Sequence, residues 1–120
     1  MLAFAVLSAT ALIGMLLAAW HLRATDGSLP PWWAGAIHGL CGAAGFAALL
    51  LALGGPARGV TQGAGSFGVV AAVMLGAALG VGGAVPLLWR WRGQPPGGVL
   101  AIHAVIAISG YVILAAYTLS

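Results

Sequence analysis

Two histidines end the same short phrase in the two halves of the chain. Residues 30–38 read PPWWAGAIH and residues 95–103 read PPGGVLAIH, so each Ala-Ile-His follows a Pro-Pro pair. His38 and His103 are 65 residues apart (103 − 38 = 65). Because neutral imidazole is a common ligand of transition metals, two histidines in matched positions are candidates for joint ligation of one metal ion.

The remaining metal-ligating residue types narrow the choice of metal. The chain has no glutamate, one aspartate and one cysteine, Cys41, which we expect to be a small buried side chain in an apolar run. A di-iron carboxylate site is therefore excluded, and a structural zinc site usually takes four protein ligands. Two facing imidazoles with no acidic neighbour are suited to the axial positions of a haem iron. The pair thus predicts one haem b, with His38 and His103 as its iron ligands.

The composition predicts the solvent around these residues. The chain has 120 residues, of which 62% are hydrophobic and 4% are charged, whereas a soluble domain carries roughly 25% charged residues. Too few polar side chains are available to face water, so the chain is expected to contact the lipid bilayer. Its four basic residues do not form the clustered, solvated surface that a nucleic acid requires, so nucleic acid is not an expected partner.

Four apolar stretches are long enough to cross a bilayer as helices, which takes about 20 residues each. Lipid permits only helices or closed barrels, and these stretches lack the alternation of barrel strands. The predicted fold class is therefore all-α, a bundle of four transmembrane helices in one membrane domain over residues 1–120. Pro86, near the end of the third stretch, is expected to close or kink that helix. The predicted spans are Leu2–Leu22, Trp32–Gly54, Ala64–Leu88 and Gly97–Leu119.

A duplicated helical hairpin is predicted from features that recur in the same order. The first and third spans end in Trp-x-x-Arg (residues 20–23 and 89–92), Pro-Pro follows each, and a glycine and an aromatic residue stand seven and eight residues after each histidine. We assign repeat 1 to residues 1–54 and repeat 2 to residues 64–120, related by an axis along the membrane normal. Each histidine then lies about 10 Å into its helix, so the two imidazoles meet at one depth.

Small residues beside the histidines would let a flat macrocycle lie against the helix backbone. Gly35, Gly42 and Gly45 share the helical face of the first histidine, and Gly110 stands seven residues after the second, in the position that matches Gly45. Small residues are also common where ordinary membrane helices pack. We nevertheless take these four glycines as candidate cofactor-binding residues.

The basic residues predict the orientation in the membrane. Arg23, Arg90 and Arg92 fall in the first and third connections, whereas Arg58 alone falls in the second. The positive-inside rule then places the first and third connections in the cytoplasm and both termini on the periplasmic side of a bacterial inner membrane. The same three arginines could bind haem propionates or lipid headgroups. His21, at this interface, is expected to be solvated or bound to headgroups.

With these features the chain resembles small membrane b-type cytochromes, four-helix proteins in which two histidines hold a haem and which serve bacterial respiratory enzymes. The likeness covers the whole chain in architecture and rests on His38, His103 and the flanking glycines. Members with two haems need four axial histidines, so the single pair implies one haem. The resemblance implies an electron-transfer subunit, not a catalyst on its own, that relays electrons between quinone and a partner protein in a larger membrane complex.

Three other functions stay open at this point. A haem-free accessory subunit would use its small-residue faces to pack on a larger membrane protein. A small transporter or channel could also be built from two hairpins, although no acidic residue lies in any span. A chlorophyll protein would hold magnesium through a single histidine, which the matched pair disfavours.

Overall fold

The computed structural model describes residues 2–24, 30–56, 58–61 and 63–120, and all regular secondary structure among them is α-helical. All four helices are long and apolar enough to cross a membrane. The predicted fold class is thereby confirmed: the chain forms an all-α bundle of four membrane-spanning helices and is a multi-pass membrane protein in contact with lipid. The helices are α1 (Leu2–Arg23), α2 (Trp32–Leu53), α3 (Phe67–Arg92) and α4 (Gly97–Leu119).

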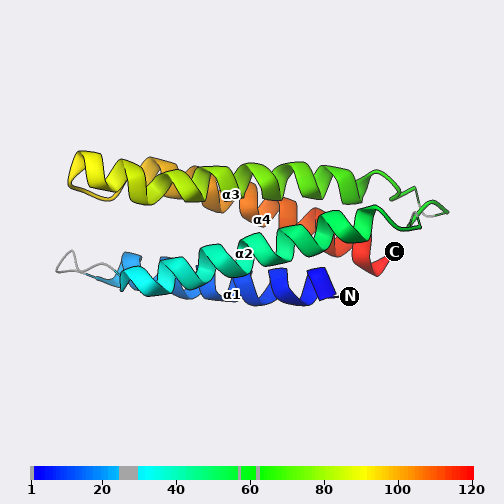
Figure 1. The fold of residues 1–120 in the computed structure, drawn as a ribbon, viewed down its shortest axis with the longest axis horizontal. Helices are drawn as coiled ribbons and strands as arrows, with labels where there is room; N and C mark the ends of the chain where they lie inside the picture. The colour runs from blue at the N-terminus through cyan, green and yellow to red at the C-terminus, as the bar shows by residue number, and fades with distance from the viewer. Residues whose placement is uncertain (1, 25–29, 57, 62) are drawn as a thin grey trace.

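The four helices lie side by side along the longest dimension of the molecule, which measures 51 Å (Figure 1). Both chain termini and the α2–α3 connection lie at one end, which we call the terminal end. The last residues of α1 and α3 and the first residues of α2 and α4 lie at the other. We call this the arginine end because Arg23, Arg90 and Arg92 lie there.

The third helix begins and ends later than its apolar run predicts. It starts at Phe67 instead of Ala64, because Ala64 donates its backbone N–H to the carbonyl of Gly59 at 2.7 Å and so belongs to a preceding turn. Gly59 and Gly63 have φ angles of 65° and 72° in this connection. These angles lie in the left-handed region, which glycine adopts without steric cost.

At its other end, α3 continues for six residues past Pro86. The proline removes one N–H donor from the helix but does not close it, contrary to one of the two expected effects. The helix ends at Gly93, which has a φ angle of 69° and donates its N–H to the carbonyl of Trp89 at 2.9 Å. A left-handed glycine is a common way to end a helix.

Two hairpins make up the bundle. Helix α1 packs along α2 and α3 packs along α4, while the α2–α3 and α1–α4 contacts between the hairpins are smaller. The diagonal pairs, α1 with α3 and α2 with α4, have no backbone contact within the described residues. The site must therefore be reached across a diagonal by side chains.

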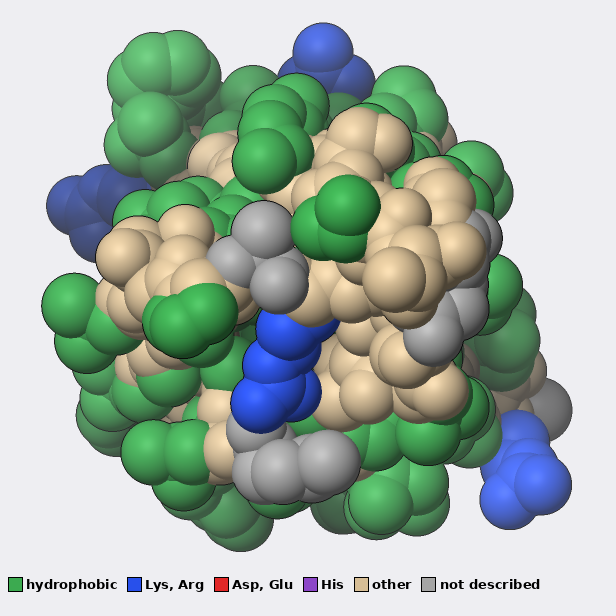
Figure 2. Space-filling view, turned by 90° about the vertical axis from the view of Figure 1, so that its right-hand side faces the viewer, with side chains coloured by type: hydrophobic (Ala, Val, Ile, Leu, Met, Phe, Trp, Pro, Cys, Tyr) green, Lys and Arg blue, Asp and Glu red, His purple; other side chains and the backbone are tan. Residues whose placement is uncertain are grey.

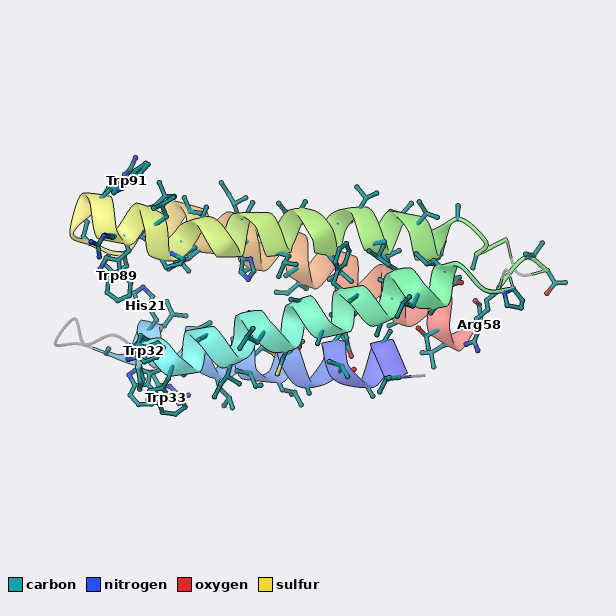
Figure 3. The ribbon with its side chains drawn as sticks, in the orientation of Figure 1. His21, Trp32, Trp33, Arg58, Trp89 and Trp91 are labelled. Atoms are coloured by element: carbon teal, nitrogen blue, oxygen red, sulfur yellow. The ribbon has the colours of Figure 1, made fainter. Side chains whose placement is uncertain are left out.

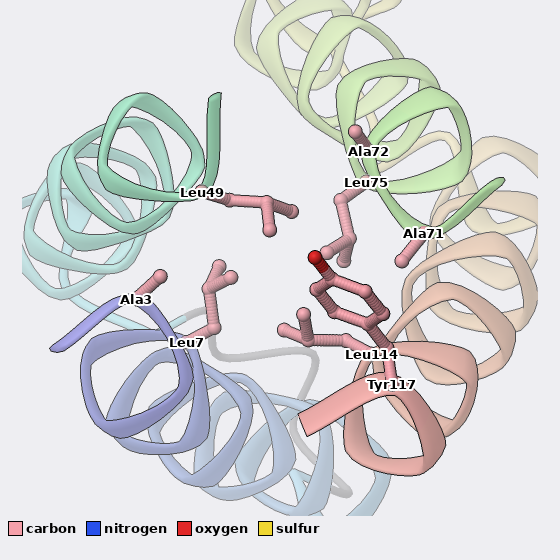
Figure 4. Close-up of a cluster of buried hydrophobic side chains, with 8 residues drawn as sticks. All are labelled: Ala3, Leu7, Leu49, Ala71, Ala72, Leu75, Leu114 and Tyr117. Carbon is pink, nitrogen blue, oxygen red and sulfur yellow. The ribbon is translucent and has the colours of Figure 1, made fainter. Parts of the chain in front are cut away.

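The buried hydrophobic core lies near the terminal end. Leu49 and Leu114 are each 1% exposed, and side chains from all four helices converge with them on the centre of the bundle (Figure 4). In the described segments between the two histidines and the arginine end, Pro96 is the sole buried apolar residue. The core cluster comprises Ala3, Leu7, Leu49, Ala71, Ala72, Leu75, Leu114 and Tyr117.

The two hairpins bury corresponding residues. Leu49 of α2 and Leu114 of α4 are 65 residues apart (114 − 49 = 65), the same separation as the two histidines. Leu7 of α1 and Leu75 of α3 are both buried and are 68 residues apart (75 − 7 = 68). This is the pattern that two copies of one hairpin produce, and it supports the duplication; the repeat boundaries stay a prediction.

The outer surface suits a lipid environment. Figure 2, which looks onto the terminal end, shows mainly hydrophobic side chains around a single basic side chain near the centre. Figure 3 identifies Arg58 at this end and places Trp32, Trp33, Trp89 and Trp91 at the other. Tryptophan rings gathered at one level are typical of a membrane–water interface.

Candidate functional site

The two matched histidines meet in the interior of the bundle. The ring centres of His38, on α2, and His103, on α4, are 6.0 Å apart, and the ring planes are inclined at 83°. Both side chains are half-buried. Because the backbones of α2 and α4 do not touch, the imidazoles alone span this diagonal. The prediction that the two rings meet at one depth is consistent with this geometry.

Each imidazole is held by a backbone carbonyl of the other helix in its own hairpin. Nδ1 of His38 lies 3.1 Å from the carbonyl oxygen of Thr10 on α1, and Nδ1 of His103 lies 2.8 Å from that of Ala78 on α3. A carbonyl oxygen only accepts, so in each neutral ring Nδ1 carries the hydrogen and donates it. Nε2 of each ring is then left with its lone pair, the form in which imidazole ligates a metal.

Two glycines allow the rings to approach these carbonyls. Gly14 stands four residues after Thr10, and Gly82 stands four residues after Ala78. A methyl group at either glycine would lie 2.8 Å from Cε1 of the neighbouring imidazole, closer than carbon atoms pack. Any larger residue at these positions would push the ring away from its carbonyl.

The sequence analysis missed Gly14 and Gly82. They are 68 residues apart (82 − 14 = 68), the same separation as Thr10 and Ala78, whereas the histidines that they touch are 65 apart. The signal that could have found them is a helix pair matched at its own separation, independently of the histidine helices. In a chain with 20 glycines, this pair carries no local mark.

The Nε2 atoms border open space. Neither has a hydrogen bond within the described residues, where the Nδ1 contacts are the imidazole hydrogen bonds found. In that part of the chain no buried side-chain nitrogen or oxygen is without a partner, so an unpartnered Nε2 cannot be sealed inside protein. Each ring therefore presents a free lone pair to unfilled space.

The four glycines predicted to bind a cofactor have different surroundings. Gly45 and Gly110 are buried against Leu7 and Leu75, with a methyl group at either glycine falling 2.7 Å and 3.1 Å from the respective leucine Cγ. Gly42 is half-buried, near the methyl of Thr10. Gly35 is exposed, with open space around its Cα. A cofactor-binding role for these glycines stays a prediction, while the contacts of Gly45 and Gly110 hold each hairpin together.

The predicted arginines lie at the surface. Arg23, Arg90 and Arg92 are all exposed in the last turns of α1 and α3. They are available to lipid headgroups or to a negatively charged group at this end of the bundle. Their pairing with haem propionates stays a prediction.

His21 and Trp89 occupy corresponding positions inside the bundle. The inward-facing positions of α1 continue from Gly14 by seven residues to His21, and those of α3 continue from Gly82 by seven residues to Trp89. Both side chains are half-buried. The match of Trp20 with Trp89 in the Trp-x-x-Arg pattern therefore differs by one residue from the match of the inward faces.

The separation of the rings fits a metal held between them. An imidazole nitrogen lies about 2.0–2.1 Å from a metal that it ligates, so rings on opposite sides of one ion have centres about 6 Å apart. The observed 6.0 Å agrees with that value. The described residues contain no group of three or more histidine, cysteine or acidic side chains that could hold a metal. The donor set is thus two imidazoles, which suits the axial positions of a macrocycle-bound ion better than an all-protein site.

Comparisons with known proteins give no relative. The chain matches no family model, no curated protein and no solved structure. The functional argument therefore rests on the residues and their geometry.

Proposed function

We propose that this protein is a membrane electron-transfer subunit that binds one haem b between α2 and α4. His38 and His103 are the two axial ligands. When bound, the haem supplies a metal centre that gains and loses one electron. The chain's own residues provide the ligands, the orientation of each ring and an apolar surrounding.

The observation that carries the proposal is the paired imidazole geometry. The ring centres lie 6.0 Å apart, and each Nδ1 donates to a backbone carbonyl. Metal-ligating histidines almost always donate their second ring N–H to a carboxylate, a carbonyl or water, which fixes the tautomer and the ring orientation. The same arrangement occurs twice, once in each hairpin, and leaves both Nε2 atoms available.

The unfilled arginine half of the bundle also supports a cofactor. A membrane bundle without one is expected to pack its interior along its whole length, because packing drives helix association in lipid. The buried core here stops near the level of Thr10 and Ala78, and Pro96 is the sole buried apolar residue beyond it in the described segments. A macrocycle between the rings would occupy this part of the interior.

The proposal includes a setting for the subunit. Three arginines at one end against Arg58 at the other favour a bacterial inner membrane with the arginine end in the cytoplasm and both termini in the periplasm. The described helices leave little mass outside the membrane, so the redox partners must be reached within or at the bilayer. We propose quinone and a partner protein in a larger membrane complex as those partners.

The test is a reduced-minus-oxidised absorption spectrum of the purified protein. The wild type should show the sharp α and β bands of a low-spin b-type haem, and H38A and H103A should each lose them. H21A is the matched control, since it removes the third histidine but leaves both ligands, and it should keep the band positions.

Two results would overturn the proposal. A folded wild-type protein that takes up no haem would favour a haem-free accessory subunit. Unchanged bands in H38A or H103A would show that the iron, if present, is ligated elsewhere.

A further inference from the structure

The interior at the arginine end contains two polar groups that no protein atom satisfies. His21 and Trp89 are half-buried, and within the described residues neither the imidazole nor the indole nitrogen makes a hydrogen bond. Figure 3 shows their side chains pointing toward one another between the two hairpins. The other labelled tryptophans of this end, Trp32, Trp33 and Trp91, point outward.

The two groups stand at the same distance from the imidazole pair. His21 is seven residues after Gly14, and Trp89 is seven residues after Gly82, the two glycines that contact the metal-ligating rings. Seven residues are two helical turns, or about 10 Å along the bundle. One group belongs to α1 and the other to α3, the two helices that carry no axial ligand.

The ligand geometry decides how a bound macrocycle would lie. Two axial ligands on the α2–α4 diagonal require the plane of the ring to be perpendicular to that diagonal. The ring therefore extends along the bundle axis and sideways toward α1 and α3. Toward the terminal end its way is blocked by packed leucines, including Leu7, Leu49 and Leu114.

The two ends also differ in polarity. Haem b carries two carboxylate side chains on one edge, and a carboxylate buried without a partner is strongly disfavoured. The terminal side offers an apolar core, whereas the arginine side offers two nitrogen groups and a basic surface. The carboxylate edge must therefore face the arginine end.

We propose that His21 and Trp89 bind the two propionate groups of the haem, one from each hairpin, and so set which edge of the macrocycle faces the arginine end. The inference rests on the proposed haem site. The indole Nε1–H can only donate, and the imidazole of His21 can donate from either ring nitrogen. Both are thus suited to a carboxylate, which only accepts, and Arg23, Arg90 and Arg92 stay at the surface outside them.

The test compares two forms of the cofactor. The full chain in detergent micelles is titrated with ferric protohaem and with its dimethyl ester, in which neither propionate carries a charge. The wild type should bind the free acid at least about tenfold more tightly, the value of one charge-assisted hydrogen bond. H21F and W89F should each reduce that preference while keeping the absorption bands of the bis-imidazole iron. W91F is the matched control, since it changes an outward tryptophan of the same turn, and it should keep the full preference.

The outcomes separate this inference from the function it rests on. If the wild type binds neither form of the haem, the proposed function fails. If it binds both forms equally, or if H21F and W89F keep the preference of the wild type, the propionate assignment fails and the haem site stands. Equal binding of the two forms, with a short-chain quinone shifting the haem bands in the wild type but not in H21F, would assign the pair to a quinone instead.

Discussion

Each imidazole depends on two partners that contribute no side-chain chemistry, a backbone carbonyl and a glycine. The carbonyls of Thr10 and Ala78 already belong to helices, and a carbonyl oxygen has a second lone pair for the histidine N–H. The ring reaches that lone pair only because the residue four positions later lacks a side chain. This explains how an apolar helix can orient a metal ligand without any polar residue of its own, as Ala78 does for His103.

The glycine contact gives the most direct prediction at the residue scale. In G82A, the new methyl group would lie 2.8 Å from Cε1 and 2.9 Å from Nδ1 of His103. The ring must move and lose its carbonyl, so haem affinity should fall by about 10–100-fold, the usual cost of removing such a partner. Spectroscopic titration with haem measures the change.

The adjacent glycine is the control for this variant. Gly83 has open space around its Cα, so G83A adds the same methyl group to the same helix without a contact. It should bind haem like the wild type and gain slightly in helix stability. Equal haem affinity in G82A and G83A would contradict the role of the glycine.

The residues that could be predicted from the sequence are those with a distinctive chemical type. Histidine is rare in this chain, so one separation of 65 residues was enough to pair His38 with His103 and predict that they meet. Gly14 and Gly82 could not be paired this way, because α1 and α3 match at 68 residues and glycine is common. The Trp-x-x-Arg pattern, at a separation of 69 (89 − 20 = 69), hid the correspondence of His21 with Trp89.

At the scale of the helices, the repeated glycine–aromatic pair acquires a packing role. Gly45 and Gly110 receive the leucines of their own hairpins, as described above, and the aromatic residue that follows each reaches the other hairpin. Tyr111 stacks on Phe4 with ring centres 5.7 Å apart, and Phe46 lies over Gly76. The sequence pattern was detected as a sign of duplication; its use in joining the hairpins required the three-dimensional arrangement.

The α1–α4 seam contains a hydrogen bond between helices. The Ser8 hydroxyl donates to the carbonyl of Phe4 at 2.7 Å, so the Tyr111 hydroxyl, 2.7 Å away, must be the donor to Ser8. The matching contact in the α2–α3 seam has no hydroxyl, because Phe46 and Gly76 stand in those places. The loop joins α2 to α3 covalently, whereas the α1–α4 seam depends on such contacts.

This hydrogen bond predicts the effect of Y111F. The variant keeps the ring stack on Phe4 and loses the hydroxyl, so the free energy of unfolding should fall by about 0.5–1.5 kcal/mol. Reversible unfolding in mixed micelles measures it. S8A in the Y111F background should add little, because both changes remove one interaction. Y117F, which removes a hydroxyl with no hydrogen bond in the described structure, is the control; an equal loss in Y117F would contradict the assignment.

At the scale of the whole molecule, packing and charge are divided between the two ends. The terminal end holds the core of apolar side chains, and the arginine end holds the basic residues and the tryptophans. Fold class and the positions of the helices could be predicted from hydropathy, because lipid leaves the backbone few choices. The division of the core could not, since every span is apolar along its whole length and hydropathy does not distinguish a lipid-facing leucine from a buried one.

The charge division predicts the orientation in the membrane. In a C41S background, V60C adds one thiol to the α2–α3 connection and Q94C adds one to the α3–α4 connection, both at exposed positions. A membrane-impermeant maleimide applied to intact cells should label V60C and leave Q94C unlabelled until the membrane is opened. The reverse pattern would place the arginine end outside. The C41S protein without an added thiol gives the background.

The separation of the site into two matched halves has a consequence for how the chain must assemble. One hairpin carries one imidazole, one carbonyl to hold it and one glycine to admit it, which is half of a coordination shell. An iron that is bound from both sides thus reports on the union of the hairpins. Two separately synthesised fragments, divided in the α2–α3 connection, would form a colourless pair of components that acquires the red of a six-coordinate haem only on association.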